Sequence, residues 1–235
     1  MKITLVVMGL MAPILGAAIV TYQAGDELHV WAASGLNMRK APELQSEVIA
    51  AIPFGAAVIS RGNKTINEYQ YHSQKLTDRG TAFDDKPFAV VLHGHWVKVA
   101  YGGVEGFVFD AYLSSWAPLS DPGVFTSVSD YFKQVCDTAI YLERRDTVTT
   151  LGTERIVFSN GAYVSSYFHT GGFGFQMNLP EYSVEEAYLL LLHLNKQVSG
   201  IIQDENGKIH VGWNAGGFTI ESYRGIVIIS GEWAC

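Results

Sequence analysis

Hydrophobic and polar residues alternate over short segments in the first half of the chain, and turn-forming residues bound these segments. Leu36 and Met38 alternate with Asn37 and Arg39, and the apolar run at 48–52 ends in a Pro-Phe-Gly turn. A two-residue period with glycine or proline at the ends is typical of β-strands. We therefore predict short strands joined by turns, at 36–39, 48–52, 57–60, 88–92, 96–100 and 106–109.

The second half contains two segments with the 3.6-residue period of a helix. The first is predicted at 130–143. The second, at 184–194, is apolar on nearly every side and follows Ser183 and Glu186, which have the spacing of a capping box. The other segments are predicted strands, at 155–158, 162–169, 173–179, 198–203, 209–213, 218–223 and 225–230. Together they predict an α+β domain with antiparallel strands and one buried helix.

The N-terminus has the pattern of an export signal. Lys2 precedes an almost wholly apolar stretch at 3–20, and Gly16, Ala17 and Ala18 are small enough for a cleavage site. We predict a signal peptide at 1–24 and an exported protein, periplasmic or secreted. The alternative is an uncleaved membrane anchor, because about 18 apolar residues is the lower limit for a spanning helix.

Composition and charge narrow the class of protein. The 235 residues are 48% hydrophobic and 17% charged, which is enough apolar material to bury a core. The formal net charge of −7 disfavours nucleic acid and anionic lipid, since both are negatively charged. We expect no cofactor, no nucleic-acid partner, and membrane contact only through an uncleaved N-terminal segment.

Three segments of the first half resemble the bacterial SH3 (SH3b-like) family, in the family's order. Residues 35–42, GLNMRKAP, resemble its opening LNVRSGPS strand, and residues 46–58, SEVIAAIPFGAAV, resemble its S-x-V-I-x-x-I-P-x-G-x-x-V stretch. Residues 94–114, from GHWVKVAY to EGFVFDAYLS, resemble its close, G-x-W-V-K-V-x-Y-x-G-x-x-G-Y-V-x-x-x-Y-L-S. The resemblance does not extend to residues 129–235.

The resemblance implies a small β-barrel at 29–114 that binds a ligand in the cell envelope. Members of the family often bind peptidoglycan or a protein partner, and aromatic side chains in a shallow groove would form the site. The candidates are Trp96, Tyr101, Phe107 and Tyr112, of which Tyr101 and Tyr112 are expected at the surface. The alternative for each ring is a place in the core.

Two connections complete the predicted domain organisation. Residues 61–93 form an insertion relative to shorter family members. This insertion is either a functional loop or a disordered segment, and the sequence does not decide between the two. Residues 115–128 contain Pro118, Pro122 and Gly123 among serines, and are predicted to link the barrel to the domain at 129–235.

The two cysteines, Cys136 and Cys235, are a possible disulfide in an exported protein, and two unrelated thiols are the alternative. Cys136 is a poor match to a cell-wall peptidase nucleophile. Such a cysteine lies at the start of a helix, whereas Cys136 lies inside the predicted first helix.

Other chemistry is sparse. His93 and His95 form an H-x-H pair without a third metal ligand, so we predict no metal site. Glu185 and Glu186 fall in the first turn of a helix, where carboxylates complement the dipole, and His193 is expected in the core. We therefore predict a non-enzymatic binding or adaptor protein. A cell-wall hydrolase and an inhibitor or immunity-like protein, both acting through the C-terminal domain, are the alternatives.

Overall fold

Two antiparallel sheets account for most of the chain in the computed structural model. The structure describes residues 22–62, 71–76, 90–120, 127–146, 151–194, 200–204, 206–213 and 216–234. The predicted fold class, mainly β with an α+β C-terminal half, is confirmed. Most of the predicted signal segment lies outside the described residues. Within them, no helix is both long enough and apolar enough to span a membrane.

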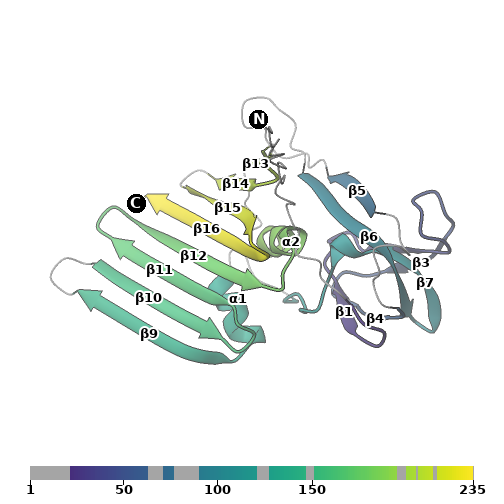
Figure 1. Cartoon of the computed structure of the whole chain (residues 1–235), viewed down its shortest axis with the longest axis horizontal. Coiled ribbons are helices and arrows are strands. Elements are labelled where there is room, and N and C mark those ends of the chain that lie inside the picture. The colour runs from purple at the N-terminus through teal and green to yellow at the C-terminus, as the bar shows by residue number, and fades with distance from the viewer. Residues whose placement is uncertain are drawn as a thin grey trace, which may run out of the picture.

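The first sheet is strongly curled (Figure 1) and has the strand order β3-β2-β7-β6-β4-β1-β8, with β5 paired to β6. Inward positions alternate along the strands, so Leu36 and Met38 on β2 and Val97 and Val99 on β6 are buried, as the sequence pattern predicts. The elements are β1 (Glu27–Val30), β2 (Leu36–Arg39), β3 (Val48–Ile52), β4 (Ala57–Ser60), β5 (Tyr71–Leu76), β6 (Val90–Tyr101), β7 (Val104–Phe109), the 3₁₀ turn η1 (Asp110–Tyr112) and β8 (Leu113–Ser114).

The second sheet consists of two four-strand meanders, each preceded by a helix. The order β13-β14-β15-β16-β12-β11-β10-β9 joins the last strands of the two meanders at its centre. The sequence shows no repeat, so this repetition is visible only in the structure. The elements are α1 (Val128–Val135), β9 (Thr138–Asp146), β10 (Leu151–Phe158), β11 (Tyr163–His169), β12 (Gly172–Pro180), α2 (Val184–Leu194), β13 (Gly200–Gln203), β14 (Ile209–Trp213), β15 (Gly216–Tyr223) and β16 (Ile226–Ala234).

Both helices lie against one face of this sheet, and neither of them covers the other face (Figure 1). The covered face carries the buried row Met177, Ile229, Ile220 and Ile209, which lie opposite one another on β12, β16, β15 and β14. Because side chains alternate between the faces of a strand, the neighbouring positions point to the open side.

The first predicted helix is too long. Helix α1 ends at Val135, and the remainder of the predicted segment forms the edge strand β9. The backbone N–H of Ser159 donates to the carbonyl of Asp137 at 2.7 Å, where β9 begins its ladder with β10. Pairing with β10 therefore decides the conformation of a segment whose apolar residues suit either period.

The two halves share one hydrophobic core. The ring of Trp31, which follows β1, lies 6.0 Å from Tyr131 of α1 and 5.6 Å from His193 of α2, measured between centroids. Trp116 stacks on Tyr182 at 6.3 Å. His193 is therefore packed between the two halves, and its Nε2 lies 2.9 Å from the carbonyl oxygen of Leu119.

Tyr22 also belongs to this core, with only 6% of its surface exposed. Residues 22–24 of the predicted signal segment are therefore part of the described fold.

Candidate functional site

The four predicted ligand-binding aromatics do not form one open groove. Trp96 lies opposite Phe109 across the β6–β7 ladder, and the Phe109 ring contacts Trp96 and Tyr112 at centroid distances of 6.1 and 6.0 Å. Trp96 is 4% exposed and Tyr112 is 8% exposed. The expectation that Tyr112 lies at the surface is wrong, because η1 turns it inward, and burial raises its pKa to about 12. Tyr101 is half-buried at the hairpin and lies opposite Val104.

Phe107 is half-buried and lies among charged groups. Arg39 and Lys98 are its cross-strand neighbours on β2 and β6, and they point to the same side of the sheet. Glu105 accepts from Lys98 Nζ at 2.9 Å and from Arg61 Nε at 3.1 Å. The hydrogen bond from Lys98 and its charge hold the pKa of Glu105 below its ordinary value. We call Phe107, Arg39, Lys98, Arg61 and Glu105 the Phe107 face, which carries three cations and one carboxylate.

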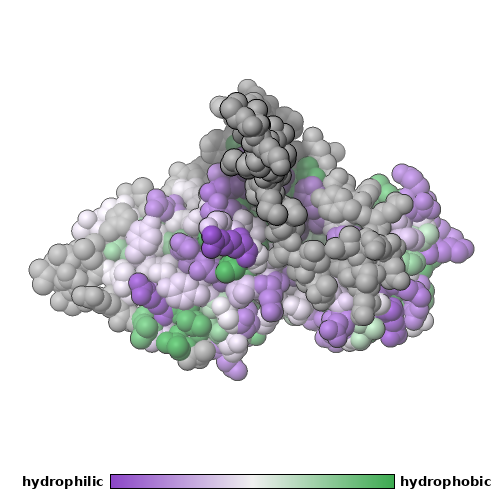
Figure 2. All heavy atoms as spheres, viewed as in Figure 1, coloured by the Kyte–Doolittle hydropathy of each residue, from purple (hydrophilic) through white to green (hydrophobic). Residues whose placement is uncertain are grey.

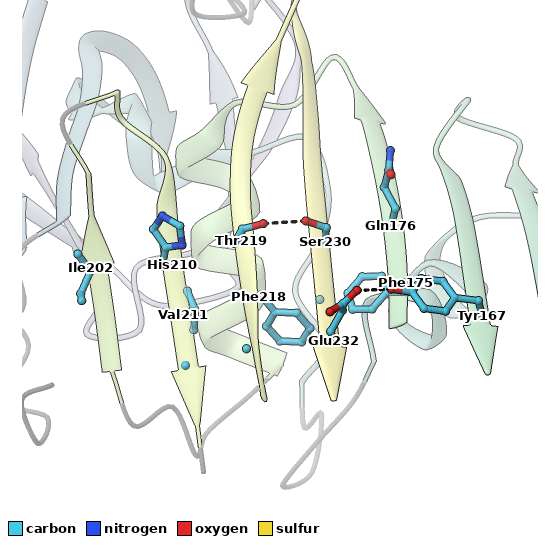
Figure 3. Close-up of a pocket in the computed structure, with 13 residues that line it drawn as sticks. Tyr167, Phe175, Gln176, Ile202, His210, Val211, Phe218, Thr219, Ser230 and Glu232 are labelled. Carbon is cyan, nitrogen blue, oxygen red and sulfur yellow. Dashed lines mark hydrogen bonds between the residues drawn. The ribbon is translucent and has the colours of Figure 1, made fainter. Parts of the chain in front are cut away.

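A second site lies on the open face of the C-terminal sheet, as a cavity of about 660 Å³ (Figure 3). Strand register explains its composition. One row across the sheet carries polar groups, and the next carries an aromatic ring, a carboxylate and glycines. Helix α2 lies behind the sheet in the same view, so these side chains face away from the core. We call this site the sheet trough, and its polar side chains are Tyr167, Gln176, His210, Thr219, Ser230 and Glu232.

Glycines give the sheet trough its depth. Tyr167 leans over Gly174, where a Cβ would collide with the tyrosine ring, and its hydroxyl donates to Glu232 Oε1 at 2.5 Å. A Cβ on Gly217 would lie 2.9 Å from the carbonyl oxygen of Val211. The floor is therefore bare backbone beside a fixed ring. This row of glycines cannot be recognised in the sequence, because it arises only from the pairing of several strands.

The sheet trough also contains hydroxyl and imidazole groups in adjacent positions. Thr219 Oγ1 lies 2.7 Å from Ser230 Oγ, while His210 Nε2 lies 3.6 Å from Asp204 Oδ2. The two hydroxyls thus pair with each other, and the imidazole faces the carboxylate of the preceding turn. This arrangement is suited to hydrogen bonding with a ligand that carries both donors and acceptors.

Three carboxylates lie where the halves meet, and we call them the junction carboxylates: Asp110, Glu185 and Glu186. The backbone N–H of His95 donates to Asp110 Oδ1 at 2.7 Å, and that of His93 donates to Glu185 Oε1 at 3.0 Å. Burial raises the pKa of Glu185, and it raises that of Glu186 to about 7. Glu185 therefore joins α2 to β6, a role that the sequence analysis did not predict.

The remaining predicted chemistry is placed as follows. Among the residues with described positions, no group of three or more His, Cys, Asp and Glu side chains could hold a metal ion. Cys136 follows α1 as a free thiol, and burial raises the pKa of this thiol, which disfavours a reactive thiolate.

Cys235, the second half of the possible disulfide, lies outside the described residues. The pairing of Cys136 with Cys235 therefore stays a prediction.

Comparison with known proteins identifies a family for part of the chain. Residues 34–114 match the family model described as "Bacterial SH3 domain". No curated protein and no solved structure matches the chain. The matched segment runs from just before β2 to the end of β8, so it contains the four predicted aromatics and all five residues of the Phe107 face. The chain therefore carries a bacterial SH3 domain at residues 34–114.

Proposed function

We propose that this protein is an exported, non-catalytic binding or adaptor protein of the cell envelope, and that its SH3 domain holds a peptidoglycan or protein ligand. The observation that carries the proposal is the family match over residues 34–114. The apolar N-terminal segment supports export, and the raised pKa of Cys136 argues against a thiol nucleophile.

The Phe107 face is the proposed contact surface. Phe107 and the exposed Val48 beside Arg39 provide an apolar patch, whereas Trp96 and Tyr112 are buried. The surrounding cations stand out in a chain with a net charge of −7. Apolar area with adjacent cations suits a peptide that carries free carboxylates, as the stem peptides of cell wall do.

Sedimentation with purified peptidoglycan tests the proposal, using the protein from residue 19 onward. We expect saturable pelleting of the wild type and about a tenfold weaker apparent affinity for Phe107→Ala, because truncating a central aromatic contact typically costs more than 1 kcal/mol. Tyr223→Ala is the matched control, since Tyr223 is an exposed aromatic on β15 with 59% exposure.

Two outcomes would count against the proposal in different ways. Equal pelleting of the wild type and Phe107→Ala would exclude the Phe107 face as the site. If the wild type does not pellet, the ligand is not peptidoglycan. A pull-down from envelope extract, with Phe107→Ala for comparison, then tests for a protein partner.

A further inference from the structure

We propose that the sheet trough is a second ligand site, independent of the SH3 domain, and that it takes a neutral oligosaccharide. The cavity of about 660 Å³ is within the usual range for small-ligand sites. It lies on the face that neither helix covers, and its polar groups come from β11, β12, β14, β15 and β16, all within one sheet. The site is therefore built on rigid elements.

The first argument is the shape of the sheet trough. Tyr167 is 39% exposed, and its hydrogen bond to Glu232 fixes the ring over Gly174, while Gly212 and Gly217 leave bare backbone in the lining of the cavity. A flat ring next to bare backbone is a platform for the C–H face of a sugar ring. The aromatic surface contributes contact area at a low cost in side-chain entropy.

The second argument is the hydrogen-bonding pattern. Gln176, Ser230, Thr219 and His210 lie opposite one another on four consecutive strands, so they form one row along the sheet trough. Amide, hydroxyl and imidazole groups each donate and accept hydrogen bonds. Such a row suits a ligand with hydroxyl groups, because each hydroxyl can also donate and accept hydrogen bonds.

The third argument is charge. The lining contains one carboxylate, Glu232, and none of its described side chains is Lys or Arg. A phosphate or carboxylate ligand would find no cation to replace its hydration. Neutral ligands are therefore favoured.

The fourth argument separates a saccharide from a peptide. The strands that form the floor are in the interior of the sheet, where both neighbours already pair with their backbone groups. An extended peptide binds most readily by adding its backbone to an unpaired strand edge. Here only side chains offer hydrogen bonds, which suits a ligand with hydroxyls along its whole length.

Isothermal titration calorimetry with two neutral trisaccharides, cellotriose and N,N′,N″-triacetylchitotriose, tests the inference. We expect saturable binding of at least one of them to the wild type. Gln176→Ala and Tyr167→Ala should each raise the Kd about tenfold, the effect of losing one or two hydrogen bonds or one aromatic contact. Gln134→Ala is the matched control, because Gln134 is an exposed glutamine on α1, away from the sheet trough.

The outcomes distinguish this inference from the proposed function. Phe107→Ala should bind the trisaccharide like the wild type, even if it no longer pellets with peptidoglycan. Absence of saturable binding by both sugars would overturn the inference, as would equal weakening by Gln134→Ala and Gln176→Ala. Saturable binding of the neutral peptide N-acetyl-trialanine amide in place of the sugars would also overturn it. Unchanged thermal midpoints of the variants show that the fold is intact.

Discussion

Glu186 caps the start of helix α2 and is buried between the two halves of the chain. The capping box predicted from Ser183 and Glu186 is confirmed: Ser183 N–H donates to Glu186 Oε2 at 2.9 Å, and Glu186 N–H donates to Ser183 Oγ at 3.0 Å. The spacing along the sequence fixes this local pair. It does not reveal that the carboxylate is buried between the halves near Asp110, because that neighbour comes from the other sheet.

Burial of Glu186 predicts that acid stabilises the protein between about pH 4.5 and pH 7. The pKa of Glu186 rises from 4.5 to about 7 on folding, chiefly through burial, so the folded protein keeps a proton that the unfolded chain loses. The free energy of unfolding should therefore fall as pH rises through this window, by up to about 3 kcal/mol. The raised pKa of Glu185 acts in the same direction. Urea unfolding at pH 5, 6, 7 and 8 measures this slope.

Glu186→Gln removes the ionisation and keeps an oxygen that can accept from Ser183. We expect the free energy of unfolding of this variant to depend less steeply on pH than that of the wild type. Glu47→Gln should retain the wild-type slope, because the side chain of Glu47 is 68% exposed. A slope for Glu186→Gln that matches the wild type would show that Glu186 is not the titrating group.

At the scale of helices and strands, a prediction succeeds where the local sequence signals agree, and it fails where a neighbouring strand decides the conformation. Helix α2 begins and ends as predicted, because its capping box and apolar run agree. The predicted helix at 130–143 is wrong after Cys136, because Leu142 continues the helical period while Ile140 and Leu142 also have the two-residue spacing of a strand. Both are more than half exposed on the edge strand, so only pairing with β10 distinguishes the two conformations.

The start of α1 allows a prediction with a control two residues away. Ser127 is the N-cap, and its Oγ accepts from Asp130 N–H at 3.0 Å. Ser127→Ala should lower the free energy of unfolding by about 1 kcal/mol. Ser129 Oγ is buried and has no hydrogen-bond partner within the described part of the chain, so Ser129→Ala should be neutral or stabilising. Urea unfolding of both variants measures the difference, and a larger loss for Ser129→Ala would contradict this assignment.

At the scale of the whole molecule, the sequence predicts features formed by continuous segments, but it does not predict sites formed by residues from several strands. The segments that resemble the SH3 family are continuous in the sequence, so the family can be identified from them directly. The sheet trough combines Tyr167, Gln176, His210 and Glu232 from separate strands, and their adjacency follows from register alone. The same holds for the contact between the halves, where Trp31 meets residues of α1 and α2 that lie about 100 or more positions away in the chain.

The shared core predicts that the two halves unfold together. Trp116 is central to this contact: its ring lies 6.1 Å from Phe132 and 6.3 Å from Tyr182, and its carbonyl accepts from Trp31 Nε1 at 2.7 Å. Differential scanning calorimetry of the wild type should show one transition, with equal calorimetric and van't Hoff enthalpies. Trp116→Ala removes the stacked ring and should separate this transition into two, or lower its midpoint and cooperativity.

Tyr223→Ala serves as the control for this experiment as well, because Tyr223 lies on the exposed surface of the C-terminal sheet, and it should leave one transition. Two transitions in the wild type would show that the contact between the halves is too weak to couple them. The SH3 domain would then bind its ligand without affecting the sheet. With one transition, a ligand bound at either half raises the stability of both, because it draws the whole cooperative unit toward the folded state.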